Sequence, residues 1–258
     1  MVFDSFLVRE EGNILIATFN RVAQKNSINS AMISELNEIL DIAEADPDCR
    51  ILVLEGQNGI FCTGMDFGAY LQDGDNEGLG EEVPLPMEFI NTIKRLTLSP
   101  KIIISKVDGQ VMAGGIGIIS ASDYTIATES SVFSLSEALW GLLPAMVIPY
   151  MIRRTGFHKA YTMTLTTMPI TAQQALDMNL VDEVSNKPDE SIQRLSRRLT
   201  RVEPSTVGNI KQYFRKMWIV TEEMERLAVS EITRLASLPE VRENIENFVK
   251  YKKFPWEK

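Results

Sequence analysis

The sequence has almost none of the residues that usually bind zinc. Its 258 residues include a single histidine, His158, and two cysteines, Cys49 and Cys62. A zinc site takes about three or four such ligands, so we expect no metal site. Two cysteines in a chain of this size indicate free thiols in a reducing compartment, with one disulfide as the alternative.

An excess of positive charge and long apolar runs are absent as well. The formal net charge is −9 and the isoelectric point is near 4.9, so there is no basic excess to neutralise nucleic-acid phosphates. No segment reaches the roughly 18 to 20 uninterrupted apolar residues of a membrane span, and the first residues do not form a signal peptide. We therefore expect a cytoplasmic protein that binds neither nucleic acid nor membrane.

The composition is otherwise that of a globular protein, with 45% hydrophobic residues, and short apolar runs alternate with helical patterns. Strands are expected at residues 2–9, 13–19, 51–54, 100–105, 124–127 and 131–135. Helices are expected at residues 30–46, with Ser30 as the N-cap, and at 87–98. Uninterrupted apolar strands are typical of parallel sheets buried on both faces, so the predicted class is α/β with a largely parallel sheet.

Helical patterns dominate beyond Pro149, and Thr171 with Gln174 forms a capping-box pattern. The expected helices lie at 150–156, 158–167, 171–178, 187–201, 204–214 and 220–238. We predict a core with the active site at 1–200 and a helical region at 201–258. Residues 72–86, rich in Gly, Asp, Glu and Pro, are expected to form a mobile surface loop, either a lid or a plain solvated loop.

The stretch from Gly109 to Gly141 is the strongest candidate for a functional site. A small-residue turn at Ala113-Gly114-Gly115 precedes an apolar run, and the stretch ends near Glu137 in a hydrophobic segment. A helix N-terminus with bare N–H groups and a carboxylate placed elsewhere would suit enolate chemistry. The alternatives are a packing role for Gly114 and a structural salt bridge for Glu137.

Several motifs, in this order and spacing, resemble the crotonase superfamily, the enoyl-CoA hydratase/isomerase fold. They are Phe19–Arg21, Asn26–Asn29, Phe61–Phe67, Ala113–Gly115, Ser122–Asp123, Phe133–Gly141 and Leu180–Val184. The resemblance implies repeated ββα units and C-terminal helices that trimerise, often as hexamers built from two trimers. It implies no metal or redox cofactor, only a substrate carried on phosphopantetheine.

The same resemblance implies roles for individual residues. The backbone N–H groups of Met65 and Gly114 would form an oxyanion hole for the enolate. Asp66 would shape the loop that presents the Met65 amide. Lys25 matches a basic position near the nucleotide end of the coenzyme A site, although a solvated lysine is an equal alternative.

One departure from the family bears on the reaction. Ordinary hydratases of this family use two glutamates; the first position corresponds to Gly117 here and the second to Glu137. One carboxylate can still run a syn elimination, taking the C2 proton and returning it to the departing hydroxyl. A water-adding hydratase is therefore disfavoured.

Within the superfamily, the sequence is most similar to the dehydratases of polyketide β-branching cassettes. The similarity lies in Ser134–Glu137, the missing first glutamate, Pro149 with Ile152–Arg154, and Phe254–Glu257. It implies dehydration of 3-hydroxy-3-methylglutaryl on an acyl carrier protein, with Arg153, Arg154 and Lys250–Lys253 as candidate docking residues for that acidic partner. Open alternatives are other crotonase chemistry on acyl-CoA (hydration, isomerisation or decarboxylation) and a non-catalytic scaffold.

Overall fold

The computed structural model of the protein describes residues 3–74, 85–218 and 220–257, and its strands form two sheets. The larger sheet has the order β1-β2-β3-β5-β7-β10. Its strands are β1 (Phe6–Glu11), β2 (Ile14–Phe19), β3 (Ile51–Glu55), β5 (Ile102–Val107), β7 (Tyr124–Ala127) and β10 (Glu183–Val184). Among the described strands of this sheet, only the β1–β2 pair is antiparallel, so the predicted α/β class with a largely parallel sheet is confirmed.

The smaller sheet carries the loops of the candidate site. Its order is β4-β6-β8-β9, with β4 (Ile60–Cys62), β6 (Gln110–Met112), β8 (Val132–Ser134) and β9 (Ile170–Thr171). The strands β4, β6 and β8 are parallel, so the chain leaves all three at the same edge. Chain segments distant in the sequence, after β4, β6 and β8, are thereby brought together.

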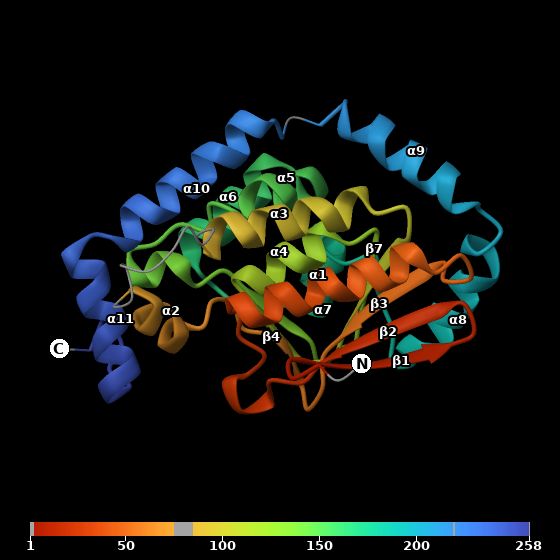
Figure 1. Ribbon diagram of the computed structural model, residues 1–258. Helices are drawn as coiled ribbons and strands as arrows, with labels where there is room; N and C mark the ends of the chain where they lie inside the picture. The colour runs from red at the N-terminus through yellow and green to blue at the C-terminus, as the bar shows by residue number, and fades with distance from the viewer. Residues whose placement is uncertain (1–2, 75–84, 219, 258) are drawn as a thin grey trace.

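Helices cover both faces of the larger sheet because its central strands are apolar on both sides. Leu52 and Leu54 of β3 pack in the core cluster that includes α1 (Ser30–Ala45), α3 (Leu85–Leu98) and α4 (Gly114–Ala121). Ile51 and Val53 face the opposite way and pack with residues of α8 (Pro188–Leu199) and α9 (Pro204–Arg215). Figure 1 shows α1, α3 and α4 above the sheet strands.

Two predicted helix starts can be compared with the structure. The N-cap of α1 is Asn29 rather than Ser30, because the Asn29 side chain accepts a hydrogen bond from the Met32 amide at 3.0 Å. Ser30 is therefore the first helical residue, and that prediction was wrong by one position. The capping box of Thr171 and Gln174 is confirmed at the start of α7 (Ala172–Asp177).

Two helices were missed from the sequence, α2 (Phe67–Gly74) and α11 (Pro239–Tyr251). The first is short and only its end, residues 72–74, overlaps the loop predicted at 72–86. The second lies between the last predicted helix and the basic tail. Most of the loop predicted at 72–86 lies outside the described residues; residues 72–74 end α2, and 85–86 begin α3.

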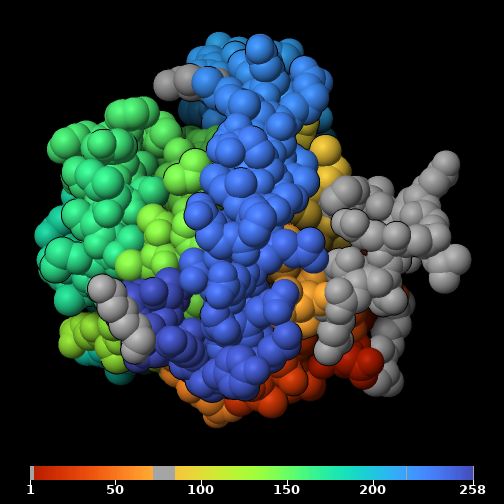
Figure 2. Space-filling model, turned by 90° about the vertical axis from the view of Figure 1, so that its left-hand side faces the viewer, coloured from red at the N-terminus to blue at the C-terminus, as the bar shows by residue number. Residues whose placement is uncertain are grey.

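The C-terminal helices form an arm around the core. After α5 (Ile148–Thr155) and α6 (Phe157–Thr166), the chain passes through α7 and α8 to α9, α10 (Glu222–Ala236) and α11. Figure 1 shows α9 and α10 spanning the upper side of the molecule and α11 returning beside α2, and Figure 2 shows the arm across one face. Within the described residues, no helix has the length and apolarity needed to cross a membrane.

Candidate active site

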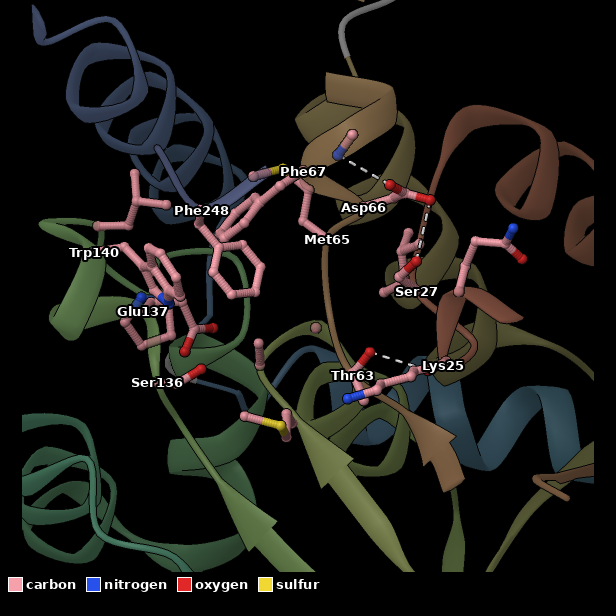
Figure 3. A pocket seen from close by; sticks show the side chains of 18 of the residues that line it. Lys25, Ser27, Thr63, Met65, Asp66, Phe67, Ser136, Glu137, Trp140 and Phe248 are labelled. Atoms are coloured by element: carbon pink, nitrogen blue, oxygen red, sulfur yellow. Dashed lines mark hydrogen bonds between the residues drawn. The ribbon is translucent and has the colours of Figure 1, made fainter. Parts of the chain in front are cut away.

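A cavity of about 690 Å³ lies between the edge of the smaller sheet and the C-terminal arm. Its walls come from the 3₁₀ helix η1 (Val22–Gln24), the loop after β4, the starts of α3 and α4, the 3₁₀ helix η2 (Glu137–Trp140), α10 and α11. Five of the six site residues predicted from the sequence line it: Lys25, Met65, Asp66, Gly114 and Glu137. Figure 3 shows Glu137 on one side and Met65, Asp66 and Lys25 on the other.

The amides of Met65 and Gly114 are available to a ligand. The loop around Met65 is fixed on both sides, because Ile28 N donates to Gly64 O at 2.7 Å and Asp66 N donates to Ile28 O at 2.8 Å. Gly114 is the first residue of α4, where helix geometry leaves amides without intrahelical acceptors. In the part of the chain that the structure describes, neither amide donates a hydrogen bond to a protein acceptor.

The two amides are held close together by glycines with little room for side chains. A Cβ added at Gly64 would lie 2.5 Å from Ala113 Cβ and 3.3 Å from Gly114 N. A Cβ added at Gly114 would lie 2.7 Å from Ile28 Cδ1. Ala113 itself has φ 49° and ψ −120°, a strained backbone conformation for a residue with a side chain. The surrounding packing therefore imposes this turn, and it leaves the start of α4 pointing into the cavity.

Among the described residues, two acids line this cavity, Asp66 and Glu137, and Glu137 has no ion-pair partner there. The residue is half-buried, but its Oε2 atom is fully buried and has no hydrogen-bond partner within the described residues. Burial raises the pKa of Glu137 to about 7, against a smaller opposite effect of the Glu137 and Ser136 backbone amides. A carboxylate with this pKa can take up and release a proton near neutral pH.

Asp66 has the opposite environment. Its Oδ1 accepts hydrogen bonds from the amides of Gly68 and Ala69, both at 3.1 Å. Its Oδ2 accepts from Arg21 Nη2 at 2.9 Å and from Ser27 Oγ at 3.1 Å. Burial acts to raise the pKa of Asp66, but these donors outweigh it and the pKa lies below its usual range. Asp66 thus starts α2 and braces the loop that carries Met65.

Gly117 does not line the cavity but lies behind its wall. A Cβ at Gly117 would be 3.2 Å from Val147 Cγ2 and 3.3 Å from Phe89 Cζ, and both of these side chains do line the cavity. The space in which a side chain would begin is therefore filled by two apolar groups. A direct substrate contact by Gly117 is not seen in this arrangement.

The candidate docking arginines both make contacts within the protein, and their part in docking stays a prediction. Arg153 donates to Ser120 O at 2.6 Å and lies 4.3 Å above the Trp218 ring, and burial lowers the pKa of Arg153 to about 10. Arg154 donates to Ser122 O and pairs with Asp182. Both guanidinium groups stabilise internal contacts, and both residues are partly buried.

An aromatic wall next to Glu137 was missed from the sequence. Its rings come from the residues Phe67, Trp140, Phe248 and Phe254. The centroid of the Trp140 ring lies 4.9 Å from that of Phe248 and 5.2 Å from that of Phe67. The aromatic residues of the C-terminal tail were visible in the sequence, but nothing local indicated that they would fold back over η2. Ser136, beside Glu137, also lines the cavity and was not predicted.

The arrangement suits chemistry in which a proton next to a carbonyl is removed. Two free amides can stabilise negative charge on an oxygen, and a carboxylate with a pKa near 7 faces the same space. Among the described residues, no cluster of three or more His, Cys, Asp or Glu side chains could hold a metal ion.

The chain is similar in sequence to a known protein family and to individual known proteins. The family model described as "Enoyl-CoA hydratase/isomerase" matches residues 9–258. The bacillaene synthase dehydratase PksH of Bacillus subtilis is 33% identical over all of this chain and 98% of its own length. The enoyl-CoA hydratase EchA19 of Mycobacterium tuberculosis is 35% identical over 69% of this chain and 67% of its own length.

Two solved structures superpose on this chain over nearly its whole length. A crystal structure of PksH from Bacillus subtilis superposes with a TM-score of 0.91 at 31% identity, over 98% of this chain and 100% of that chain. An enoyl-CoA hydratase from Mycobacterium avium superposes with a TM-score of 0.83 at 25% identity, over 99% of this chain and 100% of that chain.

Proposed function

Because the chain belongs to the enoyl-CoA hydratase/isomerase family, we propose that it removes water from 3-hydroxy-3-methylglutaryl on an acyl carrier protein, giving 3-methylglutaconyl. The family and its relatives make it an enzyme of the hydratase and dehydratase type. The relative PksH is by its name a dehydratase of bacillaene synthase. The choice of substrate and carrier is the proposal.

The proposed reaction starts at C2 of the acyl group. The Glu137 carboxylate takes the C2 proton, and the charge that develops on the thioester oxygen is stabilised by the Met65 and Gly114 amides. The C2=C3 double bond then forms as the C3–O bond breaks, and Glu137 returns its proton to the departing hydroxyl to make water. Loss of one such amide donor typically costs about 3 kcal/mol of barrier.

One observation carries this proposal: of the two acids among the described residues lining the cavity, only Glu137 lacks a charged partner. Asp66 is held by Arg21 and backbone amides, so it is poorly suited to move a proton. The position of a second catalytic glutamate, Gly117, faces Phe89 and Val147. A single acid that serves as base and then as acid fits elimination better than two-acid hydration. Decarboxylation would form the enolate by loss of carbon dioxide. That reaction needs no base, so it would give Glu137 no role.

We also propose that the protein is a homotrimer, or a hexamer built from two trimers. Several large apolar side chains on α9, α10 and the turn between them are exposed in the single chain: Ile210, Tyr213, Phe214, Met217 and Leu227. Light scattering after size-exclusion chromatography measures the mass directly, and a monomer would contradict this proposal.

The activity is tested by intact mass spectrometry of 3-hydroxy-3-methylglutaryl carrier protein incubated with the wild type and, separately, with Glu137→Gln. We expect the wild type to remove one water and the variant to be slower by about 10³-fold, since a general base is worth roughly 10² to 10⁴. Loss of carbon dioxide instead of water would identify a decarboxylase. An unchanged mass with 3-hydroxy-3-methylglutaryl and other 3-hydroxyacyl thioesters would favour a scaffold, and equal rates would remove Glu137 from the mechanism.

A further inference from the structure

The proposed substrate has a carboxylate at the end of its acyl chain, and this charge needs a partner when the acyl group enters a largely apolar cavity. Within the described residues the cavity is lined by two cationic side chains, Lys25 and Lys252. Residues 75–84 contain no Lys or Arg in the sequence. The choice of a carboxylate partner in this cavity is therefore between two lysines.

Lys25 lies on the side of the cavity away from Glu137. Its carbonyl oxygen accepts a hydrogen bond from Thr63 Oγ1 at 3.0 Å, which ties the end of η1 to the loop after β4. Figure 3 shows Lys25 and Thr63 together, across the cavity from Glu137 and Trp140.

Lys252 is connected to the Glu137 side through a chain of ring contacts. Its Nζ lies 5.3 Å from the centroid of the Phe248 ring, and that ring lies 4.9 Å from the Trp140 ring. Trp140 ends the same four-residue helix η2 that begins at Glu137. Lys252 itself caps the C-terminus of α11 with φ 55°, where the chain turns back toward η2.

The ammonium group of Lys252 has no strong partner of its own. Within the described part of the chain, it donates one hydrogen bond, to Val249 O at a long 3.5 Å, and forms no ion pair. Lys252 is exposed, so its charge is hydrated and free to move toward an incoming anion.

The proposed reaction fixes the direction of the acyl chain. With the thioester oxygen at the Met65 and Gly114 amides and C2 at Glu137, the atoms beyond C3 extend past Glu137, and the pantetheine arm leaves on the other side. We propose that Lys252 binds the terminal carboxylate of the substrate and selects acyl groups that carry one. This inference rests on the proposed dehydration.

The test compares two pantetheine thioesters, 3-hydroxy-3-methylglutaryl and 3-hydroxy-3-methylbutyryl, which differ by the terminal carboxylate. The readout is the ratio of their kcat/KM values for the wild type, Lys252→Gln, Lys252→Arg and Lys25→Gln. A charge-assisted hydrogen bond at an exposed site is worth about tenfold, so we expect Lys252→Gln to lower the ratio about tenfold, mainly through KM, and Lys252→Arg to restore it. The matched control is Lys253→Gln, an exposed neighbour that does not line the cavity and is expected to keep the wild-type ratio.

The outcomes separate this inference from the function on which it rests. An active wild type whose ratio is unchanged by Lys252→Gln would overturn the role of Lys252, and a reduced ratio for Lys25→Gln alone would assign the carboxylate to Lys25 instead. An equal loss in Lys252→Gln and Lys253→Gln would show a general charge effect and also overturn it. No turnover of either acyl group by the wild type, on pantetheine or on the carrier protein, would instead contradict the proposed dehydration.

Discussion

Asp66 and Glu137 line the same cavity, yet their surroundings give them opposite acidities. Asp66, in the loop after β4, accepts hydrogen bonds from two amides, an arginine and a serine, and its pKa is lowered. Glu137, after β8, has a buried oxygen without a partner, and its pKa is raised to about 7. Burial acts in the same direction on both, so the hydrogen-bond donors around each carboxylate decide the difference. One wall of the cavity therefore holds a braced acid with a lowered pKa, and the other holds an acid with a pKa near neutrality.

The largest expected effect that would test this comparison is on the pH dependence of activity. Glu137 must be ionised to take a proton, and with a pKa of about 7 only about 1% of it is ionised at pH 5. We expect kcat/KM to fall about tenfold per pH unit below pH 7, reaching about 100-fold at pH 5. A rate profile between pH 5 and 9 measures this, and a flat profile across pH 5–7 would contradict a base with a raised pKa.

A somewhat smaller effect is expected on the stability of the wall that holds the braced acid. In Asp66→Asn the partly buried Arg21 loses its charge partner, so we expect the free energy of unfolding to fall by about 2 kcal/mol. For a chain of this size that lowers the Tm by about 4 to 8 °C. Thermal unfolding of the variant is compared with that of Asp48→Asn, an exposed acid that forms no ion pair with the residues the structure describes. Equal Tm values for the two would show that Asp66 does not brace the loop.

The smallest effect is expected for Glu137→Gln, which should raise the free energy of unfolding at pH 8, whereas Asp66→Asn lowers it. The folded pKa of about 7 lies above the ordinary value of 4.5, so the native state loses stability as pH rises from 4.5 to 7. Glu137→Gln removes this penalty, and we expect the variant to be more stable than the wild type at pH 8 by roughly 1–2 kcal/mol, but not at pH 4.5. Urea unfolding at both pH values measures the difference; a variant that gains nothing at pH 8 would mean that Glu137 ionises in the native state at no cost.

Much of the fold and part of the site followed from local sequence. The apolar strand Ile51–Leu54 predicted a sheet buried on both faces, and the structure places helices on both. The predicted family resemblance is confirmed by the family model and by relatives along the whole chain. The roles of Met65, Gly114 and Glu137 stay predictions, although the structure brings all three to one cavity. Short-range patterns reveal such features because capping, strand burial and close backbone approach depend on neighbouring residues.

Other features depended on contacts between distant residues and were decided only by the tertiary structure. The sequence showed Arg153 and Arg154 only as basic residues, and their contacts with Trp218 and Asp182 come from the fold. Phe248 and Lys252 reached the cavity only because α11 folds back against α2 and η2. The sequence by itself determined the α/β class, the glycine turn at α4 and an acid in an apolar segment. Only the tertiary structure decided that the pKa of Asp66 is lowered and that of Glu137 is raised. The physical reason is that the pKa of a carboxylate depends on its three-dimensional neighbours.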